Sequence, residues 1–381
     1  TGIPNMGNPK VWAMYAAYYK DYFTRNPGAR YVSISAEDGL TIDERPESRR
    51  LDSFEYDSSM GSFAATDRMW FFHNRVINEV VKDFPDKKFG VLVYSDNMAP
   101  PRLERVHPNM ALVFAPLGIS PLHHVRDPRS KTNRGYRLWL ESWMEQAKAA
   151  GAETYYYDYE PTGFCWNVAL ICPRWGIIGK NYPYFHQLGL DGHTTQGHDD
   201  WASCGLDNYL MERLYWDVTQ DYHAVIADYC RARFGAAASA MEAYYRIYED
   251  AMDAIPDLYS NEVWANHLIL TPAVRAKARA QLAVAVALGD SEHAKAQLAA
   301  MQQVQRSTDA FCDAIELARE TADFGQALTV METSFVVRDE LNQIYSHYMN
   351  PWRTDKKTRA QYTTGGIYKQ YQAFDTKIKG S

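Results

Sequence analysis

The sequence has no run of Lys and Arg, and its 47 acidic residues outnumber its 40 basic residues to give a formal net charge of −7. A nucleic-acid-binding domain shows a basic patch or stripe that neutralises phosphates. No apolar run approaches the roughly 18 residues that a membrane-spanning helix needs. Neither a nucleic-acid partner nor a membrane-spanning role is therefore expected.

Cysteine is also scarce: the chain has five, and none forms a C-x-x-C pair. Structural zinc sites use closely spaced Cys ligands, so such a site is not expected. Cys165 and Cys172 are close enough to form a small-loop disulfide, with buried free thiols as the equal alternative. A Gly-rich phosphate loop and a nucleophile-elbow serine are missing as well. We expect no metal and no cofactor.

Aromatic residues are abundant, with 27 Tyr, 10 Trp and 15 Phe. Rings of this kind stack on flat apolar faces, including those of sugars, and they also fill large cores. The composition therefore agrees with a sugar-binding protein without requiring one.

The first half of the chain alternates predicted helices and strands. The predicted strands are residues 31–36, 89–94, 110–115, 153–161 and 190–196, and the helices between them are 9–25, 66–82, 134–150 and 180–188. This pattern predicts βα units in a parallel sheet. Residues 40–64 read as a long irregular loop, which is typical of functional or mobile segments. From about Leu206 the pattern is almost entirely helical.

The stretch of residues 153–161 reads as a buried strand that runs into two acids. Alternation places Tyr156, Asp158 and Glu160 on one face of that strand. Parallel sheets form active sites at the carboxyl ends of their strands, so the two acids at this end favour a catalytic role. The alternative is that these acids cap a helix or pair with Arg. The other predicted strand ends carry polar groups too: Glu37/Asp38, Asp96/Asn97, His123/His124 and Gln196/His198/Asp199.

Several short motifs, in this order and spacing, resemble the DUF4838 family. They are Asn26-Pro27-Gly28 leading into Val32-Ser-Ile-Ser35 and Asp38-Gly39, Thr66-Asp67-Arg68, Tyr157-Asp158-Tyr159, Leu188-Gly189-Leu190-Asp191-Gly192 to Gln196-Gly197, and Leu206-Asp207-Asn208-Tyr209 with Tyr215-Trp216-Asp217. The likeness covers roughly residues 5–250. That family is linked to endo-β-N-acetylglucosaminidases acting on complex N-glycans, and its fold resembles the barrels of α-glucuronidases and β-hexosaminidases. Glu37 and His198 depart from the family pattern, so the substrate is expected to differ accordingly.

The resemblance implies an α/β fold, a TIM-like (β/α) barrel over residues 1–215, followed by an α-helical domain over 216–381. Five strands are predicted where a closed barrel needs eight. We therefore expect the first strands to lie outside this sequence, on a partner chain or an N-terminal segment, or the protein to be a reduced relative; a homo-oligomer is a further expectation. The resemblance also implies a secreted, periplasmic or cell-surface location.

Glycoside hydrolysis needs an acid that protonates the leaving oxygen and a second group that stabilises the charged centre. With a 2-acetamido sugar, the substrate's own amide serves as nucleophile. We expect Glu37 to be the general acid, ahead of Glu160 as the alternative acid. Asp38 would orient the substrate, and Asp158 and Glu160 would bind hydroxyls or supply the second carboxylate. The expected sugar-binding residues are Tyr94, Asp96, Asn97, His123, His124, Tyr156, Trp166, Gln196, His198 and Trp201.

Three alternatives remain open. Each tryptophan is as well suited to the core as to sugar stacking, and a loop His pair is often structural. His193, His198, Asp199 and Asp200 include metal-ligand types, but their convergence on one ion is not favoured. At the level of function, the leading hypothesis is a glycoside hydrolase whose partner is an oligosaccharide or polysaccharide. The alternative is a glycan-binding or assembly subunit of reduced catalytic competence.

Overall fold

The computed structural model describes residues 4–36, 43–57, 62–116, 119–159, 169–195, 201–256 and 266–344. The chain divides into two compact units whose segments interleave. The first unit comprises residues 1–119, 125–158 and 184–195, and the second comprises 120–124, 159–183 and 196–381. The expected division into a barrel portion and a helical domain at residue 215 stays a prediction. Within the described ranges, no helix is long and apolar enough to span a bilayer.

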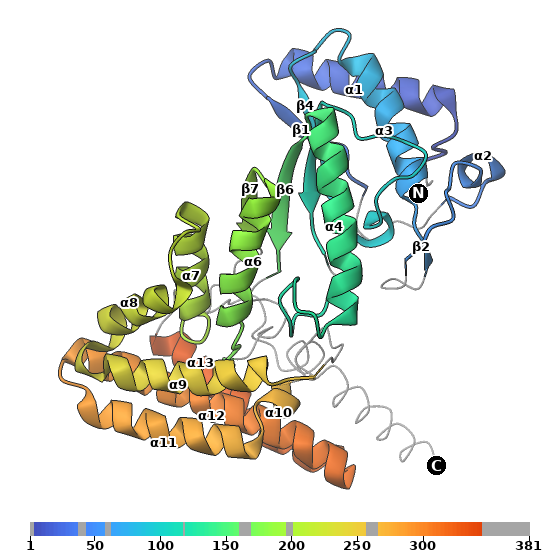
Figure 1. Ribbon diagram of the computed structural model, residues 1–381. Helices are drawn as coiled ribbons and strands as arrows, with labels where there is room; N and C mark the ends of the chain where they lie inside the picture. The colour runs from blue at the N-terminus through green and yellow to red at the C-terminus, as the bar shows by residue number, and fades with distance from the viewer. Residues whose placement is uncertain are drawn as a thin grey trace, which may run out of the picture. The chain divides into compact units, whose positions relative to one another are not determined.

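The first unit is built on a five-stranded parallel sheet (Figure 1). Its strands are β1 (Tyr31–Ser33), β4 (Lys88–Val93), β5 (Met110–Phe114), β6 (Glu153–Asp158) and β7 (Gly192–Thr195). They lie in sequence order, and every neighbouring pair is parallel. All five predicted strands are present, although each is shorter than or shifted from its predicted range by a few residues.

The helices of this unit pack on one face of the sheet. They are α1 (Pro9–Arg25), α3 (Thr66–Val80), α4 (Lys131–Ala150) and the end of α6 (Trp175–Leu188). Three strand rings mark that face: Phe89 meets Tyr19 of α1, Phe114 meets Trp143 of α4, and Tyr156 stacks on Phe185 of α6. Right-handed crossovers between strands that advance in one direction put every helix on the same side. The result is a curled half-barrel of the α/β class.

Capping residues determine where the helices begin and end. The side chain of Asn8 accepts a hydrogen bond from the backbone N–H of Lys10, as expected for the start of α1. Ser130 accepts in the same way from Asn133, so α4 starts three residues before the predicted Arg134. Gly151 ends α4 with a φ of 71°, a conformation that glycine adopts without a Cβ penalty.

The segment predicted as a long irregular loop contains three short elements. They are α2 (Pro46–Arg49), β2 (Tyr56–Asp57) and β3 (Ser62–Phe63), and the two strands pair antiparallel. Arg68 of α3 is buried and ties this segment down: its Nε donates to Asp52 at 2.6 Å and its Nη1 to the Asp43 carbonyl at 2.5 Å. The described part of this segment is therefore an anchored substructure.

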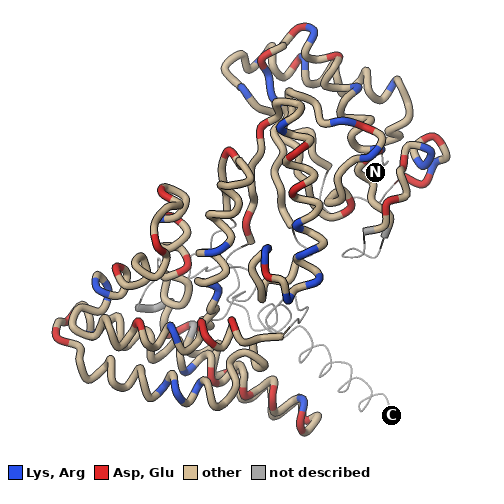
Figure 2. Tube along the Cα trace, viewed as in Figure 1, with Lys and Arg blue, Asp and Glu red and all other residues tan. Residues whose placement is uncertain are grey.

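The second unit is mainly helical, as the sequence predicted. The first unit also contains the short helix η1 (Ser95–Asn97). The elements of the second unit from α7 onwards are α7 (Gly205–Trp216), α8 (Tyr222–Phe234), η2 (Gly235–Ala237), α9 (Ala238–Asp253), α10 (Asn266–Ile269), α11 (Pro272–Leu288), α12 (Glu292–Thr321) and α13 (Phe324–Ile344). In Figure 1, α9, α11 and α12 run side by side. Acidic and basic residues intersperse along these helices in Figure 2. Buried Arg275 of α11 pairs with Asp309 at 3.3 Å and Glu316 at 3.1 Å of α12.

Candidate active site

The end of β4 turns sharply into η1. Asn97 holds this turn: its Oδ1 accepts from the backbone N–H of Tyr94 at 2.5 Å, and its Nδ2 donates to the Leu92 carbonyl at 3.1 Å. Asn97 is 3% exposed. The Asn97 amide, which was predicted to bind sugar, therefore makes hydrogen bonds within the turn. Tyr94 and Asp96 are half-buried at the sheet edge.

Ser95 has a φ of 52° in the same turn. A non-glycine residue held in this region costs about 1–3 kcal/mol and persists only where its surroundings impose it. Such residues gather at ligand sites. Of the three non-glycine residues with positive φ in the described ranges, Phe54 and Ser95 lie in the loops after β1 and β4, while Ala322 caps α12. The strain thus points to the carboxyl edge of the sheet.

Asp158 ends β6 and is 7% exposed. Tyr156 is 2% exposed on the same face, so the alternation predicted for this strand is confirmed for these two residues. Burial raises the pKa of Tyr136 in α4 far above its ordinary value; the neighbouring Tyr156 lowers it, and the charge of Asp158 raises it further. A carboxylate and two phenols therefore lie together where β6 meets α4.

The sequence analysis did not predict Tyr136 as a site residue. It lies in the middle of a predicted helix, and its spacing marks only a buried position there. Conversely, Tyr156 was predicted to bind sugar, but its ring lies in the core, 4.2 Å from that of Phe185. The Tyr156 ring is packed, and its phenol group lies close enough to Tyr136 to affect the pKa of that residue.

The contacts and spacing of the neighbouring strands show how far apart the candidate residues lie along this edge. The hydroxyl of Thr195, at the end of β7, donates to the Asp158 carbonyl at 3.2 Å. Strand β5 separates β4 from β6, so β4, which leads to Ser95, and β6, which ends at Asp158, lie roughly 10 Å apart, twice the usual strand spacing. His193 of β7 lies beside the stacked rings of Tyr156 and Phe185 and contacts both, and burial lowers its pKa to about 4. It therefore stays neutral near pH 7.

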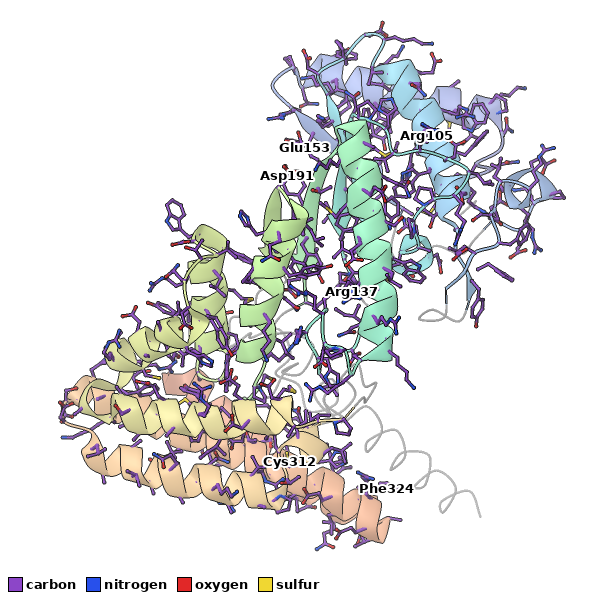
Figure 3. The ribbon with its side chains drawn as sticks, viewed as in Figure 1. Arg105, Arg137, Glu153, Asp191, Cys312 and Phe324 are labelled. Carbon is purple, nitrogen blue, oxygen red and sulfur yellow. The ribbon has the colours of Figure 1, made fainter. Side chains whose placement is uncertain are left out.

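The amino edge of the same sheet carries acids with a different role. Figure 3 labels Glu153 and Asp191, which lie near the starts of β6 and β7. Glu153 accepts from Tyr31 at 2.9 Å and pairs with Arg30 at 2.9 Å. Burial raises its pKa, but hydrogen bonds and nearby positive charges outweigh this and hold the value below the ordinary one. Glu153 also pairs with Lys88 of β4 at 3.8 Å, so its contacts link β1, β4 and β6 at this edge.

Three further predicted residues belong to the second unit. His123 is 2% exposed, and its Nε2 lies 3.1 Å from the Pro256 carbonyl. His124 is half-buried. Trp201 is 37% exposed, and its carbonyl accepts from Arg233 at 3.2 Å. The other predicted site residues lie outside the described residues: Glu37, Asp38, Glu160, Trp166, Gln196 and His198.

The second unit also buries a carboxyl group that the sequence did not single out. Asp207, in the first turn of α7, is 0% exposed, and its Oδ2 accepts from Trp175 Nε1 at 3.2 Å. Burial raises its pKa from 3.8 to about 7, while the hydrogen bond from Trp175 and the charge of Arg174 oppose the shift. Asp207 thus changes charge near neutral pH inside the helical unit.

This shift predicts a pH-dependent stability. The unfolded carboxyl ionises near pH 3.8 and the folded one near 7, so the free energy of unfolding falls as pH rises between these values and is level above them. The loss reaches at most roughly 4 kcal/mol. Asp207→Asn, which stays neutral, is expected to remove this slope and to melt at a higher temperature than the wild type near pH 8. Thermal melts near pH 4 and pH 8 test this; equal slopes in both proteins would refute it.

Residues 3–246 match the family described as domain of unknown function DUF4838. The chain belongs to this family. The match covers all five strands of the half-barrel and α7 to α8 of the second unit. The DUF4838 match also includes Tyr157-Asp158-Tyr159 and Leu206-Asp207-Asn208-Tyr209, on which the resemblance partly rested. No curated protein and no solved structure matches the chain.

Proposed function

We propose that this DUF4838 protein is a glycoside hydrolase that cleaves a glycan at a 2-acetamido sugar. The observation that carries the proposal is the buried carboxylate of Asp158 beside Tyr136 and Tyr156, at the carboxyl end of a parallel half-barrel. Sites in barrels of parallel strands form at this edge. The strained turn at Ser95 supports the same location.

In the proposed reaction, Glu37 donates its proton to the glycosidic oxygen as that bond breaks. The carbonyl oxygen of the substrate's acetamido group attacks the sugar's C1, and a water molecule then opens the resulting ring with net retention. Asp158 accepts a hydrogen bond from the acetamido N–H and balances its developing positive charge. Asp38 orients the sugar, Glu160 is the alternative acid, and Tyr94 and Asp96 bind hydroxyls.

Six further predicted sugar contacts are part of this proposal as well. They are His123, His124, Trp166, Gln196, His198 and Trp201. We further propose that the barrel is completed to eight strands by a partner chain or a preceding segment. In the described part of the chain, β1 and β7 each pair on one side only, which supports this view.

Release of sugar tests the proposal directly. A glycoprotein carrying complex N-glycans is incubated with the protein, and free oligosaccharide is measured by mass spectrometry. We expect release in which the cleavage leaves one N-acetylglucosamine on the glycoprotein. The open sheet edges favour a second candidate, a glycan-binding subunit that needs a partner. Binding of the glycoprotein without release would support that candidate and reject the hydrolase.

We also propose a secreted, periplasmic or cell-surface location. Cys172 is disulfide-bonded, whereas Cys204, Cys230 and Cys312 are buried thiols. Disulfides persist in oxidising compartments. Peptide mapping without reduction is expected to show Cys172 linked to Cys165, with the other three thiols unlabelled until the protein is denatured. A free thiol at Cys172 in protein recovered from an oxidising compartment would contradict this.

A further inference from the structure

Three aromatic side chains stand exposed on the short ribbon formed by β2 and β3. Tyr56 pairs directly with Phe63 across the ribbon, and Phe54 lies two residues before Tyr56. The Phe63 ring meets the Phe54 ring at 5.9 Å and the Tyr56 ring at 5.8 Å, edge to face in both cases. Phe54, Tyr56 and Phe63 are 55%, 56% and 54% exposed. We call these three rings the ribbon platform.

Exposure of the three rings reduces the stability that the ribbon would gain from their burial. An isolated two-stranded ribbon is marginal in water, and burial of its rings would stabilise it. Phe54 in addition holds a φ of 57°, a conformation that glycine would adopt without strain. An aromatic residue at a strained and exposed position indicates that the ring has a role outside the fold.

The ribbon is fastened to the carboxyl edge of the sheet. Immediately after Phe63, the backbone N–H of Ala64 donates to the Glu55 carbonyl at 2.8 Å, and that of Ala65 donates to the Asp96 carbonyl at 2.6 Å. Phe63 and Ala65 are two residues apart, about 7 Å of extended chain. The platform therefore adjoins the strained turn that carries Tyr94 and Asp96.

The rim of the ribbon is polar. Glu55, between Phe54 and Tyr56 in sequence, forms an ion pair with Arg102 at 2.7 Å, and the Arg102 side chain is 63% exposed. An apolar surface with hydrogen-bonding groups beside it suits a pyranose ring, which has apolar C–H faces and hydroxyls around its edge. Aromatic side chains offer such a surface.

We propose that the ribbon platform is a distal subsite that binds a sugar of the glycan beyond the bond to be cleaved. The rings of Phe54, Tyr56 and Phe63 contact the apolar C–H groups of the sugar, and Arg102 and Glu55 bind its hydroxyls. A protein partner suits the platform less well, because three half-exposed rings offer roughly 300 Å² and a stable interface needs about 800 Å² on each side. This inference rests on the proposed function for its substrate class, but sugar binding at the platform is measurable without hydrolysis.

The test compares a long and a short probe. The long probe is a biantennary N-glycopeptide, and the short one is an aryl N-acetylglucosaminide. Phe54→Gly removes a ring and relieves the positive φ, so it is expected to keep the melting temperature, and Tyr56→Ala removes the neighbouring ring. Each is expected to weaken glycopeptide binding in calorimetry about tenfold, equivalent to 1.4 kcal/mol. Binding of the short probe stays unchanged.

Tyr18→Ala is the matched control, because Tyr18 is 58% exposed on α1 and takes no part in the platform. Wild-type glycopeptide affinity in both platform variants would overturn the inference, as would a wild type that binds neither probe. A change of oligomeric state in Tyr56→Ala, seen by sedimentation, would assign the platform to a second copy instead. If the wild type binds through the platform but releases no sugar, the proposed hydrolase fails and the subsite stands. If sugar is released and both variants bind as the wild type does, only the subsite fails.

Discussion

Replacing Asp158 by asparagine is expected to lower the rate of oligosaccharide release roughly a thousandfold, or about 4 kcal/mol of transition-state stabilisation. The amide has almost the same shape as the carboxylate but carries no charge, so it cannot balance the positive charge that develops on the acetamido group. The Asp158 side chain is 7% exposed at the end of β6. Since asparagine has almost the same size, the substitution removes the charge without opening a cavity. Circular dichroism is expected to show an unchanged fold.

The matched control for this variant is Asp191→Asn. Asp191 lies just before β7 at the opposite edge of the same strand pair, and its Oδ2 accepts from the Thr154 N–H at 2.8 Å. An asparagine oxygen can keep that bond, so near wild-type release is expected. If Asp158→Asn retains more than a tenth of wild-type activity, Asp158 is structural. Glu37→Gln and Glu160→Gln, assayed in parallel, then identify the acid; full activity in Glu37→Gln would reject Glu37.

Among the substitutions considered, Asp67→Ala is expected to cause the largest loss of stability. Asp67 is 1% exposed at the start of α3, and its carboxylate accepts from the backbone N–H groups of Arg102, Leu103 and Glu104 at 2.7–3.2 Å. Alanine leaves three partly buried donors unpaired, each worth about 1–3 kcal/mol when fully buried. Partial access of water to this loop limits the total to about 3 kcal/mol. Urea unfolding followed by circular dichroism measures the change.

Asp83→Ala provides the comparison for that loss. The Asp83 side chain is 57% exposed, and its partner is Lys20 at 2.6 Å on the surface of the same unit. Exposed pairs contribute at most about 1 kcal/mol. A loss in Asp67→Ala no greater than that in Asp83→Ala would mean that the loop at 102–104 does not depend on the carboxylate.

Local signals in the sequence predicted the elements well where neighbours in the chain decide them. Asn8-Pro9 and Thr271-Pro272 predict helix starts, and the structure caps α1 and α11 with those side chains. Alternation along residues 153–158 predicted the buried face that carries Tyr156 and Asp158. The ribbon platform escaped prediction because its pairing joins residues across a polar segment whose pattern is too short to show a period.

The sequence by itself determined the alternation of strands and helices, the helical second half and the polar residues that follow each strand. It did so because capping and periodicity act within one or two turns of chain. Only the tertiary structure decided which of those polar residues are engaged in the fold: Asn97 holds its own turn, whereas Asp158 lies beside the phenol of Tyr136. Contacts such as Asp67 with the loop at 102–104 join positions some 35 residues apart, and no local pattern encodes them.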